Sequence, residues 1–219
     1  MTRARVAILI SGRGSNMHAL IAASRDPAYP ADIVLVVSNQ PDAPGLALAR
    51  TSGVEAIAIA HQLFGVDRAA HERTIDTALR EVRADLVCLA GYMRLLTSFM
   101  VCSWQGRMLN IHPSLLPAFP GLGTHERALA AGVKLHGCTV HLVTQKMDQG
   151  PILAQAAVPV LPGDTADGLA ARVLVQEHRI YPMALRCFIE GKVGRLPRPD
   201  SALANPAPLE GLRVPSPLP

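Results

Sequence analysis

Two polar side chains stand at the end of an apolar, strand-like run in the segment NIHPSLLPAFPG. Asn110 and His112 are two residues apart, so on a strand they share one face while Leu109 and Ile111 point to the core. Pro113 cannot donate a hydrogen bond to a neighbouring strand, and we expect the strand to end there. A carboxamide donor beside an imidazole that can be protonated near neutral pH suits a carbonyl oxygen that becomes an oxyanion. A histidine held only by backbone groups is the alternative.

A partner carboxylate is available at Asp148 in VTQKMDQGP, although this residue could also serve only its Gly- and Pro-rich turn. A zinc site in HGCTVH is a weaker hypothesis. On a strand, His136 and Cys138 share one face and His141 points to the other, so three ligands would not converge without a bend. We therefore expect no metal. Ser114 lies outside a GxSxG elbow, so the sequence does not indicate a serine nucleophile.

A glycine-rich loop, ISGRGSN, follows the first apolar run and opens a helical stretch, a position where backbone amides bind anions. The loop is not a dinucleotide fingerprint, because Met17 stands where a third glycine is needed. The second apolar run also ends in serine and asparagine, where an acidic residue would hold a ribose. We expect Gly14, Ser15 and Asn16 to hold a single phosphate. A tight turn that needs glycine only for its geometry is the alternative.

The elements that must position these residues alternate between short β-branched runs and Ala/Leu-rich stretches. Such alternation is typical of a mostly parallel central sheet with helices on both faces, so we predict an α/β, Rossmann-like fold. Its active site is expected at the carboxyl ends of the strands. The strands are expected within VAILI from Val6, DIVLVVS from Asp32, EAIAIA from Glu55, ADLVCLAG from Ala84, RMLNIH, GCTVHLV from Gly137 and PILAQAAVPV from Pro151.

A long helix is expected to begin near GDTAD, where Asp164 or Thr165 can cap its free amides. It should run to about Glu190, with Gly191 ending it. The segment beyond Gly194 holds 7 of the 18 prolines and shows no apolar period. We therefore predict a catalytic domain over residues 1–194 and a Pro-rich, flexible tail over residues 195–219.

Composition excludes several classes of function. Aromatic residues make up only 4% of the chain, which argues against a base-stacking nucleic-acid platform. The net charge of +4 suits a small anionic substrate and is too weak to indicate a polyanion partner. No apolar run approaches the length of a signal-peptide core or a membrane span, so we expect a cytoplasmic protein without a membrane partner. The four cysteines lack CxxC spacing and are expected to be reduced core residues: Cys88, Cys102, Cys138 and Cys187.

Several segments together resemble the phosphoribosylglycinamide formyltransferase family, the folate-dependent enzymes of de novo purine synthesis. The likeness runs from about Val6 to Gly191. NIHPSLLP with a downstream DxGP is shared by the wider group that uses 10-formyltetrahydrofolate, and SGRGSN narrows the resemblance to members that bind a ribose-phosphate amine. The segments are ISGRGSN, GYMRLL, LNIHPSLLPAFPGLGTHERAL, HGCTVHLV, DQGPILAQ and RVLVQEHRIYP.

The resemblance implies a formyltransferase fold and a role for each matching position. Asn110, His112 and Asp148 would form the catalytic group. Glu177 would touch glycinamide ribonucleotide, whose phosphate the glycine-rich loop holds. The folate would lie against Arg68, Met93, Arg94, Leu95, Leu96 and Asn110. The sequence departs from the family at Gly123, where a larger polar residue is common, and at Gln145, which replaces an acidic residue.

The reaction implied is direct formyl transfer from 10-formyltetrahydrofolate, the cosubstrate, to the amine of glycinamide ribonucleotide. The family implies a monomer or a homodimer. The nearest alternative is 10-formyltetrahydrofolate deformylase, which uses water as acceptor and usually carries an additional N-terminal domain. We expect no such domain, because the first strand begins at Val6. Methionyl-tRNA formyltransferase, with its additional C-terminal domain, and a non-catalytic folate- or phosphate-binding module are less well supported.

Overall fold

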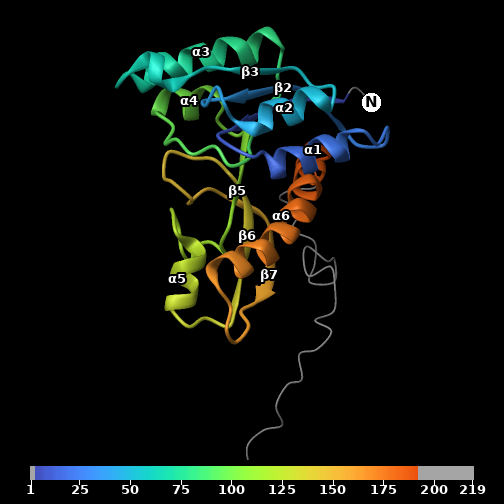
Figure 1. Ribbon diagram of the computed structural model, residues 1–219. Helices are drawn as coiled ribbons and strands as arrows, with labels where there is room; N and C mark the ends of the chain where they lie inside the picture. The colour runs from blue at the N-terminus through green and yellow to red at the C-terminus, as the bar shows by residue number, and fades with distance from the viewer. Residues whose placement is uncertain (1–2, 192–219) are drawn as a thin grey trace, which may run out of the picture.

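A computed structural model of the chain describes residues 3–191, so the predicted tail lies outside the described residues. Strands and helices alternate along the chain, as Figure 1 shows. The elements are β1 Ala4–Ile10, α1 Ser15–Ser24, β2 Ala31–Ser38, α2 Pro44–Thr51, β3 Ala56–Ala58, the 3-10 helix η1 His61–Phe64, α3 Arg68–Glu81, β4 Leu86–Leu89, α4 Ser98–Ser103, β5 Met108–His112, α5 Thr124–Ala130, β6 Leu135–Leu142, β7 Ile152–Pro159 and α6 Ala166–Ile189.

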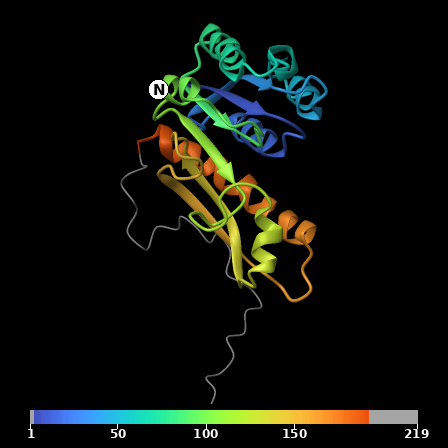
Figure 2. The same ribbon diagram turned by 90° about the vertical axis from the view of Figure 1, so that its left-hand side faces the viewer.

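The strands form a seven-stranded sheet in the order β3-β2-β1-β4-β5-β6-β7. The pairs from β3 to β5 are parallel, whereas β6 runs antiparallel to β5 and β7 antiparallel to β6. Figure 2 shows β5 leading from the upper, parallel part of the sheet into the lower part formed with β6 and β7. The predicted mostly parallel sheet is therefore confirmed, with a reversal over its last two strands.

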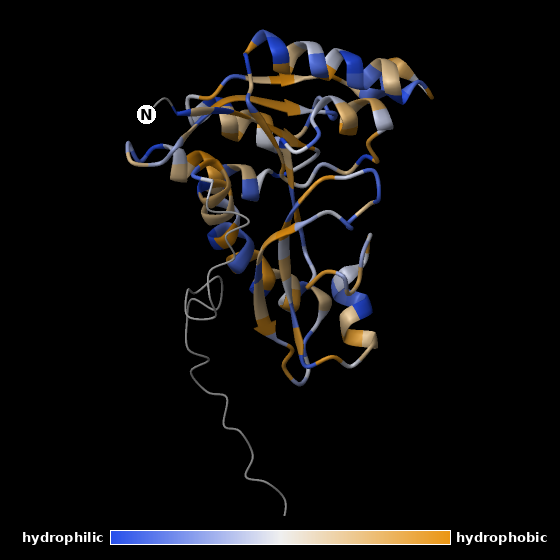
Figure 3. Cartoon of the chain, turned by 180° about the vertical axis from the view of Figure 1, so that it is seen from behind, coloured by the Kyte–Doolittle hydropathy of each residue, from blue (hydrophilic) through white to orange (hydrophobic). Residues whose placement is uncertain are grey.

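Helices cover both faces of the sheet, as predicted. One apolar cluster packs side chains of α1, α2, α5 and α6 against one face, and Figure 3 shows the apolar strands beneath them. A second cluster packs α3 and α4 against the other face, and it reaches only as far as Met108 on β5. Beyond Met108, the side chains of β5 that lie on this second face are those of Asn110 and His112. On this face the apolar core ends at Met108, but the sheet continues. Asn110 and His112 therefore lie on a part of the sheet that the apolar core does not cover.

The last helix begins and ends close to the predicted residues. Thr165 is its N-cap and accepts a hydrogen bond from the Gly168 amide at 3.1 Å. Asp164, the other predicted cap, instead accepts from the Leu161 amide at 2.7 Å and forms an ion pair with Arg172. The helix ends at Ile189, one residue before the predicted end.

The cysteine prediction is right for two of the four residues. Cys88 and Cys138 are buried, but Cys102 is exposed and Cys187 is only half-buried. Cys102 lies on the short helix α4, which turns Met100 and Val101 to the core and leaves its other side to solvent. All four thiols are free.

Candidate active site

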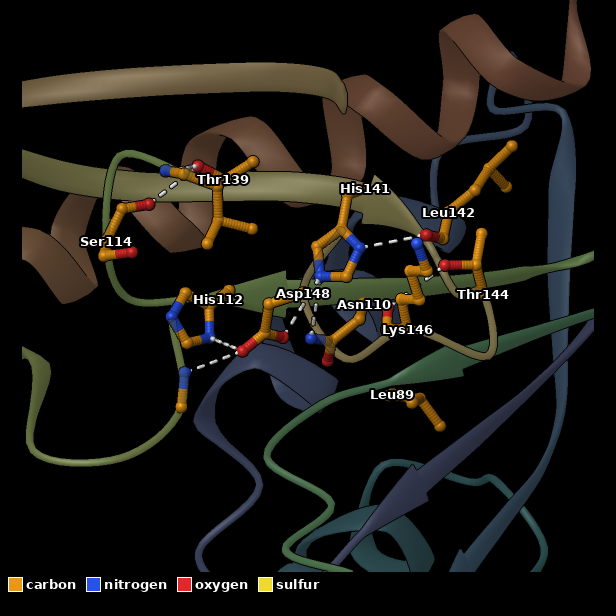
Figure 4. A network of polar contacts seen from close by, with 12 residues as sticks. Leu89, Asn110, His112, Ser114, Thr139, His141, Leu142, Thr144, Lys146 and Asp148 are labelled. Carbon is orange, nitrogen blue, oxygen red and sulfur yellow. Dashed lines mark hydrogen bonds and ion pairs between the residues drawn. The ribbon is translucent and has the colours of Figure 1, made fainter. Parts of the chain in front are cut away.

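The structure places Asn110 and His112 on the same face at the carboxyl end of β5, as the spacing predicts. His112 is buried, and its Nε2 donates a hydrogen bond to the Phe119 carbonyl at 3.0 Å. Its Nδ1 faces Asp148 Oδ2 at 3.6 Å, as Figure 4 shows. A proton on Nδ1 would therefore point toward the Asp148 carboxylate. Asn110 is paired with Leu89 of the neighbouring strand β4, so the two side chains lie on the same face of the sheet.

Asp148 lies in the loop between β6 and β7, which folds back over the polar face of β5. Its φ of 55° is in the left-handed region, which Asp and Asn tolerate better than most residues. The carboxylate Oδ2 accepts a hydrogen bond from the Gly121 amide at 2.8 Å. Asp148 therefore connects the loop after β5 with the loop after β6, and the strained backbone places its carboxylate between two histidines (Figure 4).

His141 is the second of these histidines, and its part in the site was not predicted from the sequence. Its Nδ1 donates to the Leu142 carbonyl at 2.9 Å, which leaves the lone pair of Nε2 to accept from Asn110 Nδ2 at 3.1 Å. Burial lowers the pKa of His141, although the Leu142 carbonyl and Asp148 oppose this effect. The imidazole is therefore neutral at neutral pH, and its 3.7 Å approach to Asp148 is not an ion pair. The hydrogen bond to Nε2 fixes the orientation of the Asn110 amide.

The three side chains considered as zinc ligands, those of His136, Cys138 and His141, do not converge. His141 faces the polar site, whereas Cys138 packs in the apolar cluster on the other face, as the strand alternation predicts. His136 instead contacts His125, with Nε2 and Nδ1 3.2 Å apart. Within residues 3–191, no group of three or more His, Cys, Asp or Glu side chains is arranged to hold a metal ion.

The glycine-rich loop turns sharply from β1 into α1. Gly14 has φ 73°, and a Cβ there would come within 3.0 Å of Met17 and 3.2 Å of the Gly45 backbone. Gly45, at the start of α2, donates its amide to the Gly12 carbonyl at 3.0 Å. A Cβ on Gly45 would meet that carbonyl at 2.8 Å, so this glycine is required for α2 to approach the loop. Sequence reasoning missed Gly45 because it lies outside any phosphate-loop pattern.

A pocket of about 300 Å³ opens beside this loop, and the loop after β4 forms its other wall. Asn16 contributes to the lining and donates from Nδ2 to the buried Glu177 carboxylate at 2.6 Å. Burial raises the pKa of Glu177, and the bond from Asn16 partly opposes this. Asn16 Oδ1 is buried without a hydrogen-bond partner among the described residues. The lining residues are Ser11, Gly12, Arg13, Gly14, Ser15, Asn16, Ala90, Gly91 and Met93.

The segment predicted to bind folate follows β4 and begins in the same pocket. Ser11 holds it to the glycine-rich loop, since its amide donates to the Gly91 carbonyl at 3.1 Å and its hydroxyl accepts from the Met93 amide at 2.8 Å. Arg68 reaches the Leu95 carbonyl at 3.5 Å. Met93 and Leu95 are 64% and 62% exposed, so two apolar side chains face solvent beside the polar site. Such exposed apolar groups are suited to the ring of a ligand.

The structure thus brings the predicted residues together in three adjoining groups. Asn110, His112 and Asp148 form one. Gly14 to Asn16 join Glu177 in the second, and Arg68 joins the segment 93–96 in the third. The groups lie at the ends of β1, β4 and β5, which are neighbours in the sheet. A pocket at a helix N-terminus, two exposed apolar side chains and an imidazole–carboxylate pair beside an oriented carboxamide together provide the groups that acyl transfer between two bound molecules requires.

Comparisons with known proteins identify the class. Residues 4–185 match the family model described as Formyl transferase. The chain therefore belongs to the formyl transferase family. Among the described residues, no helix has the length and apolar character needed to cross a membrane.

Relatives of similar length place the chain, within that family, among the phosphoribosylglycinamide formyltransferases. The protein of that name from Escherichia coli is 41% identical over 210 residues, which cover 96% of this chain and 95% of the relative. The crystal structure of the Brucella melitensis protein is 57% identical, with a TM-score of 0.82 over 86% of this chain and 96% of that one. The expected formyltransferase fold is confirmed.

The chain also matches one part of a larger protein. The trifunctional purine biosynthetic protein adenosine-3 of Bos taurus is 49% identical over 191 residues. This match covers 87% of the present chain and 19% of the bovine protein, so the chain spans about a fifth of that relative's length.

Proposed function

We propose that the chain transfers the formyl group of 10-formyltetrahydrofolate to the primary amine of 5′-phosphoribosylglycinamide. The products are formylglycinamide ribonucleotide and tetrahydrofolate, in de novo purine synthesis. The observation that carries this proposal is the position of the glycine-rich pocket and Glu177 beside the group formed by Asn110, His112 and Asp148. The reaction as proposed requires no metal ion, and the cytoplasm is its expected location. A monomer or a homodimer could perform it.

The carboxamide and the imidazole stabilise the tetrahedral intermediate. The amine nitrogen attacks the formyl carbon, a C–N bond forms, and the carbonyl oxygen becomes an oxyanion. Asn110 Nδ2 keeps one N–H for this oxygen, because its other N–H is donated to His141. Protonated His112 supplies a positive charge. A positioned donor of this kind contributes about 3–4 kcal/mol of transition-state stabilisation.

Collapse of the intermediate requires a proton to move from the attacking amine to the leaving nitrogen of the folate. Asp148 lies 3.6 Å from His112 and 3.7 Å from His141, so its carboxylate is well placed to accept a proton, directly or through water. Return of that proton to the leaving nitrogen completes the transfer. The C–N bond of the cosubstrate breaks, and the carboxylate is regenerated without a covalent enzyme intermediate.

A hydrolytic deformylase would use the same carboxamide, imidazole and carboxylate with water as acceptor. The glycine-rich pocket favours the transferase, because hydrolysis requires no second organic substrate. A product assay by mass spectrometry, with and without glycinamide ribonucleotide, distinguishes the two reactions. We expect formylglycinamide ribonucleotide and tetrahydrofolate to appear together, and only when the ribonucleotide is present. The variant His112→Ala is the control for contaminating activity. Formate release at the same rate without the amine would overturn the transferase assignment.

A further inference from the structure

Arg13 is a charged side chain in the pocket that neither the motif nor the mechanism uses. It stands between Gly12 and Gly14 in the glycine-rich loop, and it lines the pocket. Its side chain is exposed, and among residues 3–191 no carboxylate lies within ion-pair distance of its guanidinium. Its five N–H donors are therefore available to a ligand.

The pocket otherwise has little positive charge for a phosphate. The other lining residues are neutral, so Arg13 is the single formally charged side chain among them. The N-terminus of α1 adds only about half an elementary charge, whereas a phosphate monoester carries about −1.5 to −2 at neutral pH. The Glu177 carboxylate also lies behind Asn16, 2.6 Å from its amide nitrogen. Backbone amides alone would thus leave the phosphate under-neutralised near a buried acid.

Asn16 gives an independent indication that a ligand belongs at this position. The residue is only 9% exposed, it borders the pocket, and its Oδ1 has no hydrogen-bond partner among the described residues. A buried acceptor without a partner is costly unless a ligand donates to it. A ribose hydroxyl or an amine would do so, which leaves the phosphate for the donors of the loop.

We propose that Arg13 binds the phosphate of the ribonucleotide substrate and supplies the main countercharge for it in this protein. The proposal rests on the proposed function and adds a side-chain contact to the backbone cradle. A planar guanidinium can bind two phosphate oxygens at once, which gives both charge and orientation. Arg13 is a binding residue and takes no part in the transfer itself.

The test compares two ligands in four proteins by isothermal calorimetry. The ligands are glycinamide ribonucleotide and its dephosphorylated riboside, and the proteins are the wild type, Arg13→Ala, Arg13→Lys and Arg83→Ala. Arg83 is the matched control, because it is exposed and precedes β4, at the amino ends of the parallel strands, whereas the glycine-rich loop lies at their carboxyl ends. Arg83→Ala lowers the net charge by one, as Arg13→Ala does. Thermal melts confirm that each variant is folded.

We expect Arg13→Ala to weaken ribonucleotide binding about ten-fold. This factor is at the lower end of the range expected for loss of a hydrogen bond to a charged group. Riboside binding should not change. Arg13→Lys should retain part of the affinity, since it keeps the charge and loses the planar fork. Arg83→Ala should bind both ligands like the wild type. Added salt should weaken ribonucleotide binding more steeply in the wild type than in Arg13→Ala.

Equal loss of affinity for both ligands, or no loss for the ribonucleotide, would overturn the role of Arg13. In either case wild-type binding and product formation would leave the proposed function intact. A wild type that neither binds nor formylates the ribonucleotide would overturn both proposals.

Discussion

At the scale of single residues, the hydrogen bond between His141 and Asn110 decides how the site is oriented. The Asn110 amide could rotate freely about its last bond if nothing held it. A neutral imidazole whose Nδ1 is fixed by the Leu142 carbonyl offers one acceptor in one direction. Burial, which lowers the pKa of His141, therefore favours this hydrogen bond, because a protonated Nε2 could not accept it.

Replacing His141 tests this orienting role. His141→Leu removes the acceptor, so we expect single-turnover formyl transfer to slow about ten-fold, less than the 10²–10³ for deleting an oxyanion donor outright. His141→Gln offers a carbonyl acceptor and should recover part of the rate. Ribonucleotide affinity, measured alongside, should not change. A wild-type rate in His141→Leu would show that Asn110 is oriented by other groups.

The residues of the site could be predicted from the sequence to different extents. Asn110 and His112 follow from the two-residue period of a strand, which needs no tertiary information. His141 could not be found in this way, because its contact depends on the antiparallel register that pairs it with Asn110. The sequence around Asp148 is typical of a turn. That its carboxylate reaches His112 follows only from the folded loop, in which Asp148 has a left-handed backbone.

At the scale of elements, the turn from β1 into α1 contains two glycines, and only one of them is required by its backbone conformation and contacts. Gly14 needs a left-handed backbone and lacks space for a Cβ. A Cβ added at Gly12 would meet no atom within 4 Å, and the φ of this residue lies outside the left-handed region. The sequence motif does not distinguish the two glycines. In the structure, Gly14 is required for the shape of the turn, whereas Gly12 leaves open space next to its Cα.

Alanine at each position distinguishes these roles. Gly14→Ala should lower the free energy of unfolding by about 1–2 kcal/mol, the cost of a left-handed conformation for a residue with a Cβ. Gly12→Ala should unfold like the wild type. Urea titrations of both variants provide the measurement. Equal stability of the two would mean that the turn relaxes without strain, contrary to the contacts of Gly14.

Ser11 connects this turn to the segment after β4. Ser11→Ala removes the acceptor of the Met93 amide, so Met93 should be held less firmly, while the backbone hydrogen bond to the Gly91 carbonyl remains. We expect the KM for 10-formyltetrahydrofolate to rise about two- to ten-fold, the equivalent of one neutral hydrogen bond. The KM for the ribonucleotide should change less, and Ser11→Thr, which keeps the hydroxyl, should restore the folate KM. An increase confined to the ribonucleotide KM would contradict this role.

The order and direction of the elements were predictable in part. Apolar runs separated by helices indicate parallel strands, and the five strands from β3 to β5 follow that expectation. The reversal at β6 was not predictable, because a buried antiparallel strand has the same apolar composition. That reversal matters for function, since it brings the loop with Asp148 back over β5.

At the scale of the whole molecule, several histidines are held neutral by burial. Burial is the largest cause of a lowered pKa at each of His71, His125, His136, His141 and His178. For His136, which is 1% exposed, the pKa falls to about 4. At His136 the unfolded chain therefore binds more protons than the folded protein between pH 6.5 and 4, so the contribution of this residue to stability falls as the pH falls through this window.

This linkage gives an expected pH dependence. The contribution of His136 to the free energy of unfolding is fully present above pH 6.5. It is lost progressively as the pH falls to 4, and the total loss is up to about 3 kcal/mol for a pKa lowered from 6.5 to about 4. His136→Gln cannot be protonated, so its stability should depend less steeply on pH. Urea unfolding at intervals between about pH 4 and pH 7.5 measures both slopes. Identical slopes would mean that His136 titrates normally in the folded protein.

The measurement that tests the proposed chemistry most directly is the single-turnover rate of Asp148→Asn with both ligands saturating. Asparagine keeps the shape, tolerates the left-handed backbone and can still accept from the Gly121 amide, but it carries no charge beside His112. Asp32→Asn, in a half-buried ion pair with Arg3 at the start of β2, is the control for loss of one carboxylate.

We expect Asp148→Asn to slow formyl transfer by about 10²–10⁴, the usual contribution of a positioned acid-base group, while both ligands bind as in the wild type. Asp32→Asn should transfer at the wild-type rate. A near-normal rate in Asp148→Asn, or a loss confined to ligand affinity, would contradict the assignment of Asp148 to the transfer step.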